Sequence, residues 1–411
     1  MDERQALVPR LRFPEFREAG EWDISPLKKL ANRRTERNRN GKLTRVLTNS
    51  AEHGVVDQRD YFDKDIATQG NLENYFIVEK DDFVYNPRIS TFAPVGPISR
   101  NRVETGVMSP LYTVFQFKDS NTDFYAHYFK SSAWHMYMRQ VGSTGARHDR
   151  MAISNEDFMA MPLPVPSPEE QQKIADCLSS LDALIAAQAD KIDALKAHKK
   201  GLMQQLFPRE GETLPRLRFP EFRGADEWGE VKLSTQIELI SGMHLAPSEY
   251  TSSGDIPYFT GPSDYTNNSA LVHKWTNKSA NVARNGDTLV TVKGSGVGEL
   301  LLLHLSEVAM GRQLMAVREK AAHGKFIYHI LSMKRQQMMA LASGNLIPGL
   351  SRGDILGLAI SVPGIKEQQR IADCLSSLDA LIAAHIEKLD ALKTHKKGLM
   401  QKLFPSVESL V

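Results

Sequence analysis

The apolar positions of two segments follow the spacing of a long amphipathic helix. Within residues 166–208, and again within 363–405, apolar residues recur at alternating intervals of four and three. This spacing is typical of a helix whose apolar seam packs against another long helix. At 1.5 Å per residue, each helix is on the order of 55–60 Å long. The predicted seam consists of Ile174, Leu178, Leu181, Ile185, Gln188, Ile192 and Leu195 in the first segment, and Ile371, Leu375, Leu378, Ile382, His385, Leu389 and Leu392 in the second.

The start of the first helix carries a capping signal. Ser167 precedes Pro168, and Glu170 follows three positions after the serine. In a capping box the serine side chain accepts a hydrogen bond from the backbone N–H three residues on, and the glutamate side chain reaches back to the backbone N–H of the serine. Proline is favoured at the first helical position. We therefore expect the helix to begin at Pro168 with a capping box.

The two helical segments are copies of each other. Residues 170–208 and 367–405 are identical at 32 of 39 positions. A shorter segment at 9–17, Pro-Arg-Leu-Arg-Phe-Pro-Glu-Phe-Arg, recurs unchanged at 215–223. The blocks between these copies, 25–165 and 230–362, show almost no identity with each other. Uniform drift of a duplicated gene would erode both kinds of segment alike, so the pattern favours two different modules on a shared frame.

The repeat predicts the organisation of the chain. We expect an α+β protein in which two mixed α/β domains are separated by two long helices, packed as an antiparallel coiled coil. Gln188 and His385 are polar and occupy equivalent seam positions, so an antiparallel pair would bring them together and fix its register. Joining the two ends would give a nearly two-fold object, which predicts a pseudo-two-fold circular arrangement with neighbouring termini. The expected segments are constant strips at 1–24 and 209–229, variable domains at 25–165 and 230–362, constant helices at 166–208 and 363–405, and a tail at 406–411.

The variable blocks share an order of elements. Each contains a strand that enters a loop, at 82–88 and at 286–293. A helical stretch follows at about 122–141 and 324–342, then a small polar loop. Each block closes with a matching apolar residue and serine, Ile153-Ser154 and Leu350-Ser351, before a Pro-containing strand.

Known catalytic motifs are missing from these blocks. The glycine-rich loop 294–298 does not complete a dinucleotide-binding pattern, and no phosphate-binding P-loop is present. Asn86-Pro87 is followed by Arg88 and Ile89, which lack the aromatic residue that an adenine methyltransferase uses to hold a flipped base. No histidine pair has metal-ligand spacing, and no nucleophile-elbow motif occurs. The sequence therefore predicts a chain without catalytic, cofactor or metal sites.

The composition excludes several classes of protein but does not indicate a binding partner. The 411 residues include 51 Lys and Arg against 49 Asp and Glu, a formal net charge of +2. Neither a membrane-spanning run nor a signal peptide is evident, and two cysteines exclude a disulfide framework. We expect a cytoplasmic protein in which Cys177 and Cys374 are packing residues.

A basic segment and several polar loops nevertheless favour DNA binding. Residues 28–45 hold eight Lys and Arg against Glu36 alone, a strip that can neutralise phosphates or form a solvated helix face. The polar loops hold residue types that pair with base edges: Arg and Lys with guanine, Asn and Gln with adenine. The candidate DNA-binding residues are Arg88, Ser90, Thr91, Ser143, Thr144, Arg147, His148, Lys293, Ser295, Arg312, Gln313 and Asn345.

The arrangement resembles the specificity subunit of Type I restriction–modification enzymes. The resemblance rests on Pro-Leu-Pro-Val-Pro at 162–166 and on Glu-Gln-Gln-Lys-Ile-Ala-Asp at 170–176. It also rests on Leu181-Asp182, on Lys-Gly-Leu-Met-Gln-Gln-Leu-Phe at 200–207, and on their counterparts in the second half. It implies two target-recognition domains, each reading half of a bipartite asymmetric DNA target, and a helical pair that sets the gap. It also implies that the chain performs no chemistry. Two modification subunits using S-adenosylmethionine would dock on the helices and constant strips, accompanied by two restriction subunits using ATP and Mg²⁺.

The residues alone leave two other hypotheses for the function open. The chain could be a coiled-coil adaptor whose two heads bind proteins, or an enzyme with an unrecognised site. Sequence-dependent, salt-sensitive DNA affinity separates the first from the preferred interpretation. Methylation or cleavage of DNA by the chain alone separates the second.

Overall fold

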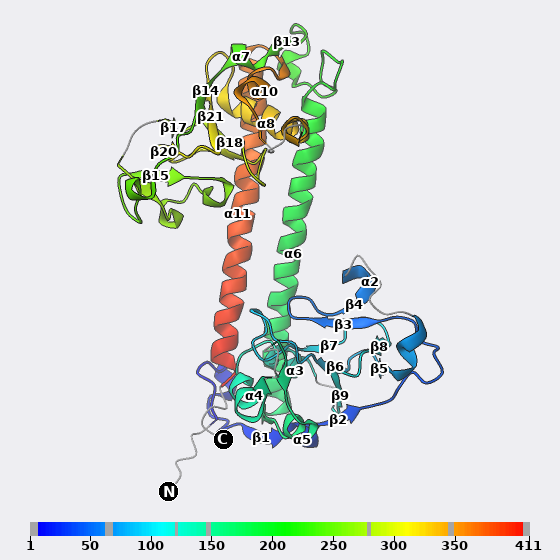
Figure 1. Ribbon diagram of the computed structural model, residues 1–411. Coiled ribbons are helices and arrows are strands. Elements are labelled where there is room, and N and C mark those ends of the chain that lie inside the picture. Colours follow the sequence, from blue (N-terminus) through cyan, green and yellow to red (C-terminus); the bar gives the residue numbers. More distant parts are fainter. Residues whose placement is uncertain are drawn as a thin grey trace. The chain divides into compact units, whose positions relative to one another are not determined.

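The computed structural model describes residues 7–61, 69–119, 122–144, 149–277, 281–343 and 349–405, which form two compact units (Figure 1). Unit 1 combines residues 1–189 with 388–411, and unit 2 consists of residues 190–387. Each unit contains one variable block and parts of both long helices. A backbone hydrogen bond of 3.0 Å from Leu11 N to Lys402 O joins segments near the two ends of the chain within unit 1.

The variable block of unit 1 is built on an antiparallel sheet of order β2-β9-β6-β7. A second layer contains the hairpin β3–β4 and the antiparallel pair β5–β8, which a parallel bridge between Val46 and Val107 joins. The strands are β1 (Asp23–Pro26), β2 (Ala31–Arg34), β3 (Leu47–Ser50), β4 (Gly54–Asp57), β5 (Phe76–Val78), β6 (Phe83–Tyr85), β7 (Ile98–Arg100), β8 (Gly106–Met108), β9 (Thr113–Phe117), β10 (Ser143–Thr144), β11 (Met151–Ala152) and β12 (Pro162–Val165). The helices are η1 (Pro14–Phe16), α1 (Leu27–Leu30), α2 (Gln58–Tyr61), η2 (Gln69–Asn74), α3 (Asp123–Tyr128), α4 (His135–Val141) and α5 (Asn155–Met159).

The variable block of unit 2 repeats this plan. Its main sheet has the order β14-β21-β18-β19, and its second sheet the order β16-β15-β20-β17 with β15 and β20 parallel. The strands are β13 (Gly229–Lys232), β14 (Ile237–Ser241), β15 (Ile256–Phe259), β16 (Trp275–Thr276), β17 (Val282–Arg284), β18 (Thr288–Thr291), β19 (Leu300–Leu302), β20 (Glu307–Met310), β21 (Leu314–Glu319) and β22 (Ala359–Val362). The helices are η3 (Pro220–Phe222), α7 (Leu233–Gln236), η4 (Pro247–Glu249), η5 (Pro262–Asp264), η6 (Ser269–Leu271), α8 (Gly324–Met333), α9 (Arg335–Ser343) and α10 (Arg352–Leu356).

The two variable blocks therefore share one topology despite their unlike sequences. Strand β6 corresponds to β18, because each is the third strand of its sheet and each follows the same chain path. The predicted helical stretches are α3–α4 and α8–α9, and the predicted serines Ser154 and Ser351 both cap the short helix that follows. Each block closes with an antiparallel pair, β1–β12 or β13–β22. The mixed α+β expectation is confirmed.

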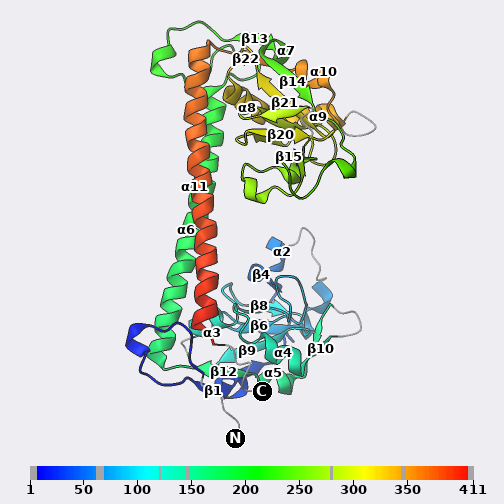
Figure 2. The same cartoon turned by 90° about the vertical axis from the view of Figure 1, so that its left-hand side faces the viewer.

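Aromatic side chains fill the core of the first block. Phe83 and Phe115 from β6 and β9 stack at 5.6 Å between ring centroids, and Phe129 contacts both rings. Trp134 packs against Phe129 and donates Nε1 to its carbonyl at 3.1 Å. Figure 2 shows α3, α4 and α5 close to this sheet. The core thus fixes the sheet to the helices, and the loops at the strand ends are left at the surface.

The two predicted long helices are present and equal in length. Helix α6 spans Pro168–Leu206 and α11 spans Ile365–Leu403, each with 39 residues. None of the fourteen predicted seam residues is exposed, whereas Leu184 and Leu381, which lie off the seam, are. Cys177 and Cys374 are half-buried free thiols. Among the described residues, no helix is long and apolar enough to cross a membrane.

The expected capping box at α6 forms only in part. Glu170 N donates to Ser167 Oγ at 3.3 Å, as predicted. The Glu170 carboxylate does not reach back to the serine, because Arg12 binds it through Nε and Nη2 at 2.7 Å each and Trp22 Nε1 donates to it at 3.0 Å. The constant strip, which supplies Arg12, therefore packs on the start of α6.

Candidate nucleic-acid interface

A buried aspartate directly precedes strand β6 and also its counterpart β18. Asp82 Oδ2 accepts a hydrogen bond from Glu79 N at 2.8 Å and pairs with Arg34 at 3.1 Å. Asp287 likewise accepts from Arg284 N at 2.7 Å and pairs with Arg318 at 2.7 Å. Burial raises the pKa of Asp82, although the Arg34 guanidinium favours its charged form. The turn and the ion pair fix where each strand starts, and so where the loop after it emerges.

The variable block of unit 1, residues 25–165, is called domain 1 below, and that of unit 2, residues 230–362, domain 2. In domain 1 the loop after β6 presents Arg88 beside a second arginine. Arg88 forms an antiparallel bridge with Arg150, flanked by hydrogen bonds from Ile89 N to Asp149 O at 2.9 Å and from Met151 N to Pro87 O at 2.8 Å. Both arginines are exposed, and neither forms an ion pair with any residue that the structure describes. The backbone pairing thus holds two cationic side chains next to each other. Sequence reasoning missed Arg150, although it lies only two residues after the predicted polar loop, which ends at residue 148.

The rest of that loop is a tight turn. Ser90 and Ala93 exchange backbone hydrogen bonds at 3.0 and 3.1 Å, and the Ser90 hydroxyl accepts from Ala93 N at 3.1 Å. Ser90 and Thr91 are exposed, and Phe92 is 72% exposed at the tip. Gly96 closes the loop at φ +83°, where a Cβ would lie 2.1 Å from the Asn86 carbonyl oxygen. The turn is therefore well defined and carries polar and aromatic groups on its outside.

The structure brings together only part of the predicted set in domain 1. Ser143 is exposed on β10, and Thr144 follows it in the hairpin with β11, whose preceding residue is Arg150. The predicted Arg147 and His148 lie outside the described residues. Arg88, Ser90, Thr91 and Ser143 thus stay candidates on two neighbouring segments.

In domain 2, Lys293 occupies the place of Arg88. It leaves β18 and bridges Gly349, while Leu350 N donates to Val292 O at 2.8 Å. The next turn, 311–313 between β20 and β21, lies alongside, because Val292 N donates to Gln313 O at 2.8 Å. Lys293, Ser295, Arg312 and Gln313 are all exposed, and the predicted Asn345 lies outside the described residues. Four of the five candidates therefore come from two adjacent turns.

The basic strip at 28–45 is not one helical face. Residues 27–30 form α1 and 31–34 form β2, so a solvated helix face is excluded. Arg34 is paired with Glu79 and Asp82, and Arg45 with Asp57 at 3.5 Å. Half-burial of Arg33 removes a further cation from the surface. The exposed cations of the strip are Lys28, Lys29, Arg37, Arg39, Lys42 and Arg45.

The described residues offer no site for metal chemistry. No group of three His, Cys, Asp or Glu side chains in the described ranges could hold a metal ion. What the two loop clusters present is cationic, amide and hydroxyl groups at the surface. Such groups bind phosphates and base edges.

The chain matches one family of known proteins. The family model described as type I restriction modification DNA specificity domain matches residues 29–197 and 225–394. The type I restriction enzyme MjaVIII specificity subunit of Methanocaldococcus jannaschii is 25% identical over 283 residues, 64% of this chain and 65% of the relative. The MjaX specificity subunit of the same organism is 25% identical over 263 residues. That match spans 62% of this chain and 61% of the relative, so the chain spans under two thirds of either relative's length.

Two solved structures share the fold. The S subunit of a type I restriction–modification system from M. genitalium has a TM-score of 0.62 at 14% identity, covering 97% of this chain and 99% of that one. A chain from a study of complex assembly in the type I R-M system has a TM-score of 0.56 at 18% identity, covering 93% and 97%. At this identity the likeness concerns the fold alone.

Proposed function

The chain belongs to the type I restriction–modification DNA specificity family, and from this premise we propose that it is the DNA-recognition subunit of such a system. Each variable domain, 25–165 and 230–362, reads one half of a bipartite, asymmetric DNA target. The observation that carries the proposal is the shared topology of two blocks with unlike sequences. Both place a cationic side chain, Arg88 or Lys293, at the same point after the corresponding strand. The two cationic side chains occupy equivalent positions, but the residues around them differ. This is what we expect of two domains that recognise different half-sites.

The two long helices form the frame in this proposal. Lys396 pairs with Asp182 within unit 1, and Lys199 pairs with Asp379 within unit 2. These pairs join α6 to α11 at equivalent positions of the repeat, which supports an antiparallel coiled coil with pseudo-two-fold symmetry. The buried seam residues support the same pairing. The length of the helical pair would set the gap between the half-sites.

Partners and cofactors follow from the same assignment. A pseudo-two-fold frame offers two equivalent docking surfaces, which suits two modification subunits and two restriction subunits. The chain itself would be non-catalytic. S-adenosylmethionine, ATP and Mg²⁺ would then be used by the other subunits. The exposed leucines Leu184 and Leu381, at equivalent positions of α6 and α11, are apolar groups available to such partners.

Selection of DNA by the purified chain tests the function. A pool of random duplexes is selected by binding and sequenced, and the affinity for the winning duplex is measured against salt. We expect a two-part sequence and an affinity that falls as salt rises. R88A should relax one half of the sequence and K293A the other, each by about 1–3 kcal/mol if the contact is bidentate. An unselective pool would instead favour the protein-binding adaptor, and methylation or cleavage by the chain alone would show an enzyme.

A further inference from the structure

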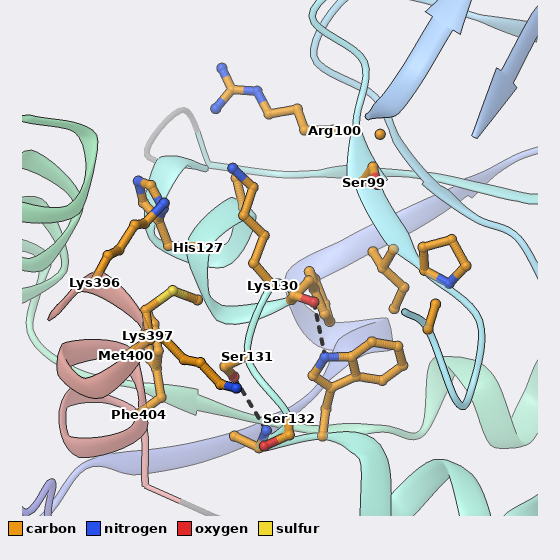
Figure 3. A pocket seen from close by; sticks show the side chains of 18 of the residues that line it. Ser99, Arg100, His127, Lys130, Ser131, Ser132, Lys396, Lys397, Met400 and Phe404 are labelled. Carbon is orange, nitrogen blue, oxygen red and sulfur yellow. Dashed lines mark hydrogen bonds between the residues drawn. The ribbon is translucent and has the colours of Figure 1, made fainter. Parts of the chain in front are cut away.

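An open pocket of about 1430 Å³ lies within unit 1, where domain 1 meets the C-terminal end of α11. Domain 1 contributes the β3–β4 turn, the loop after β6, strand β7 and the α3–α4 region. The constant helices contribute Ser179 and Asp182 from α6, and Lys393, Lys396 and Lys397 from α11. Figure 3 shows Lys130 and Lys397 extending from opposite walls into this pocket. The pocket therefore joins a variable domain to the constant frame.

The pocket carries an excess of positive charge. Seven lysines and arginines line it, against three carboxylates. Two of these carboxylates are already neutralised, because Asp123 pairs with Arg100 at 2.9 Å and with Arg102, and Asp182 pairs with Lys396 and with Lys130 at 3.7 Å.

Three of the lining cations are free to bind a ligand. Arg10, Lys393 and Lys397 are exposed and form no ion pair with any residue in the described ranges. Burial lowers the pKa of His127 to about 4, so this lining histidine is neutral at pH 7. The available charge thus comes mainly from two lysines one turn apart on α11.

The loop after β6, which carries the candidate DNA contact Arg88, forms the far wall of the pocket. Phe92, Ala93 and Gly96 line it, and they follow Arg88 in the same turn. The hydroxyls of Ser99, Ser131, Ser132 and Ser179 also line the pocket. Lysine, arginine and serine side chains are the groups that contact DNA phosphates without reading sequence. A DNA strand whose bases face Arg88 would therefore find phosphate-binding groups continuing from that loop to α11.

We propose that this pocket binds the phosphate backbone of one DNA strand that flanks the half-site read by domain 1. Lys393 and Lys397 of the constant helix neutralise two phosphates, and Arg10 of the constant strip lies beside them. The proposal rests on the proposed function and extends it. The constant helices hold domain 1 in place, and they also contribute sequence-independent DNA affinity on the side of the first half-site.

The test compares DNA affinity and its salt dependence for the full chain and two double variants. K393Q/K397Q removes the two free lysines of the pocket. K191Q/K388Q removes two exposed lysines of the same helices outside the pocket and is the matched control. Each protein is titrated with the selected duplex cut at the end of the first half-site, and with the same duplex extended by ten base pairs on that side. Thermal melting confirms that all variants fold, as expected for substitutions of exposed lysines.

We expect the extension to strengthen binding by the wild-type chain and by K191Q/K388Q, but not by K393Q/K397Q. On the extended duplex, the slope of log affinity against log salt should be about 1.8 units shallower for K393Q/K397Q, because each phosphate contact contributes about 0.9. The selected sequence should stay unchanged. Wild-type affinity and slope in K393Q/K397Q would overturn the proposal. Unchanged DNA binding with loss of the modification subunit would also overturn it and assign the pocket to an acidic protein segment. Absence of sequence-dependent binding by the wild-type chain would instead contradict the proposed function itself.

Discussion

Lys199 Nζ lies 2.5 and 2.7 Å from the two carboxylate oxygens of Asp379, and the repeat-equivalent pair Lys396–Asp182 is present in the other unit. Each pair joins α6 to α11 within its own unit. Lys396 is buried, and this burial lowers its pKa although Asp182 favours the charged form. An ion pair between α6 and α11 is thus present at the equivalent position of the repeat in each unit.

Substitution of Asp182 should destabilise the protein more than substitution of both partners. D182L leaves a buried ammonium group without its counter-ion, and we expect a loss of about 1–2 kcal/mol of unfolding free energy. The double variant D182L/K396M should recover most of this loss, since an apolar pair of similar volume removes the unpaired charge. Urea unfolding of the wild-type chain, D182L, K396M and D182L/K396M gives the coupling energy of the pair. Additive effects of the two substitutions would show that the pair contributes nothing.

The buried pair of Arg12 and Glu170 should matter more than the exposed pair beside it. Both side chains are almost inaccessible and share two hydrogen bonds, so R12M should cost about 3–5 kcal/mol. Lys173 and Glu15, 3.0 Å apart, are half exposed, and K173M should cost less than about 1 kcal/mol. Denaturant unfolding of both variants makes the comparison. Equal losses would mean that the constant strip is not anchored by Arg12.

Substitution of Gly96 should damage the reading loop of domain 1. A Cβ at Gly96 would meet the Asn86 carbonyl oxygen at 2.1 Å in addition to the strain of its positive φ. We expect G96A to lower the unfolding free energy by more than about 2 kcal/mol and to weaken recognition of the first half-site only. Gly20 has a similar φ of +74° and open space around it, so G20A should cost about 1 kcal/mol and leave DNA affinity unchanged. Loss of the second half-site in G96A would argue against independent domains.

The long helices were predictable because their apolar spacing extends over many turns, with one polar seam position in each helix, and because the sequence repeats it. The place of Arg88 and Lys293 after a strand was also predictable, since Phe83 to Tyr85 and Thr288 to Thr291 are runs of strand-forming residues. The ion-pair partners of the buried charged residues could not be predicted from the sequence. Arg12 and Glu170 are 158 positions apart, and Lys396 and Asp182 are 214 apart, so only the tertiary fold brings them together. For the same reason the capping-box pattern at Ser167 misassigned the Glu170 carboxylate, for which Arg12 and Trp22 compete successfully.

Acid should destabilise the protein through two buried histidines. Burial lowers the pKa of His329 to about 3 and that of His127 to about 4, both below the ordinary value of 6.5. Well above pH 6.5 both histidines are neutral in the folded and in the unfolded chain. As pH falls from 6.5 towards 4, the unfolded chain takes up protons that the folded chain does not, so stability falls across this range.

Replacement of His329 should reduce that loss. Neither of its ring nitrogens has a hydrogen-bond partner among the residues that the structure describes. We expect the melting temperature of H329L to fall less than that of the wild-type chain between pH 7 and pH 5. H273Q, at an exposed histidine, serves as the control for loss of an imidazole and should follow the wild-type curve. Parallel curves for all three proteins would contradict the role assigned to His329.

Exchange of one variable domain shows whether the two domains recognise separate halves of the DNA target. Residues 25–165 are replaced by the corresponding block of another family member, and the hybrid is expressed with the modification subunits of its own system. Methylation-sensitive sequencing of the host genome then reports the methylated motif. We expect a two-part motif in which one half changes while the other half and the gap stay as in the wild-type chain. A change in both halves, or a single undivided motif, would contradict it.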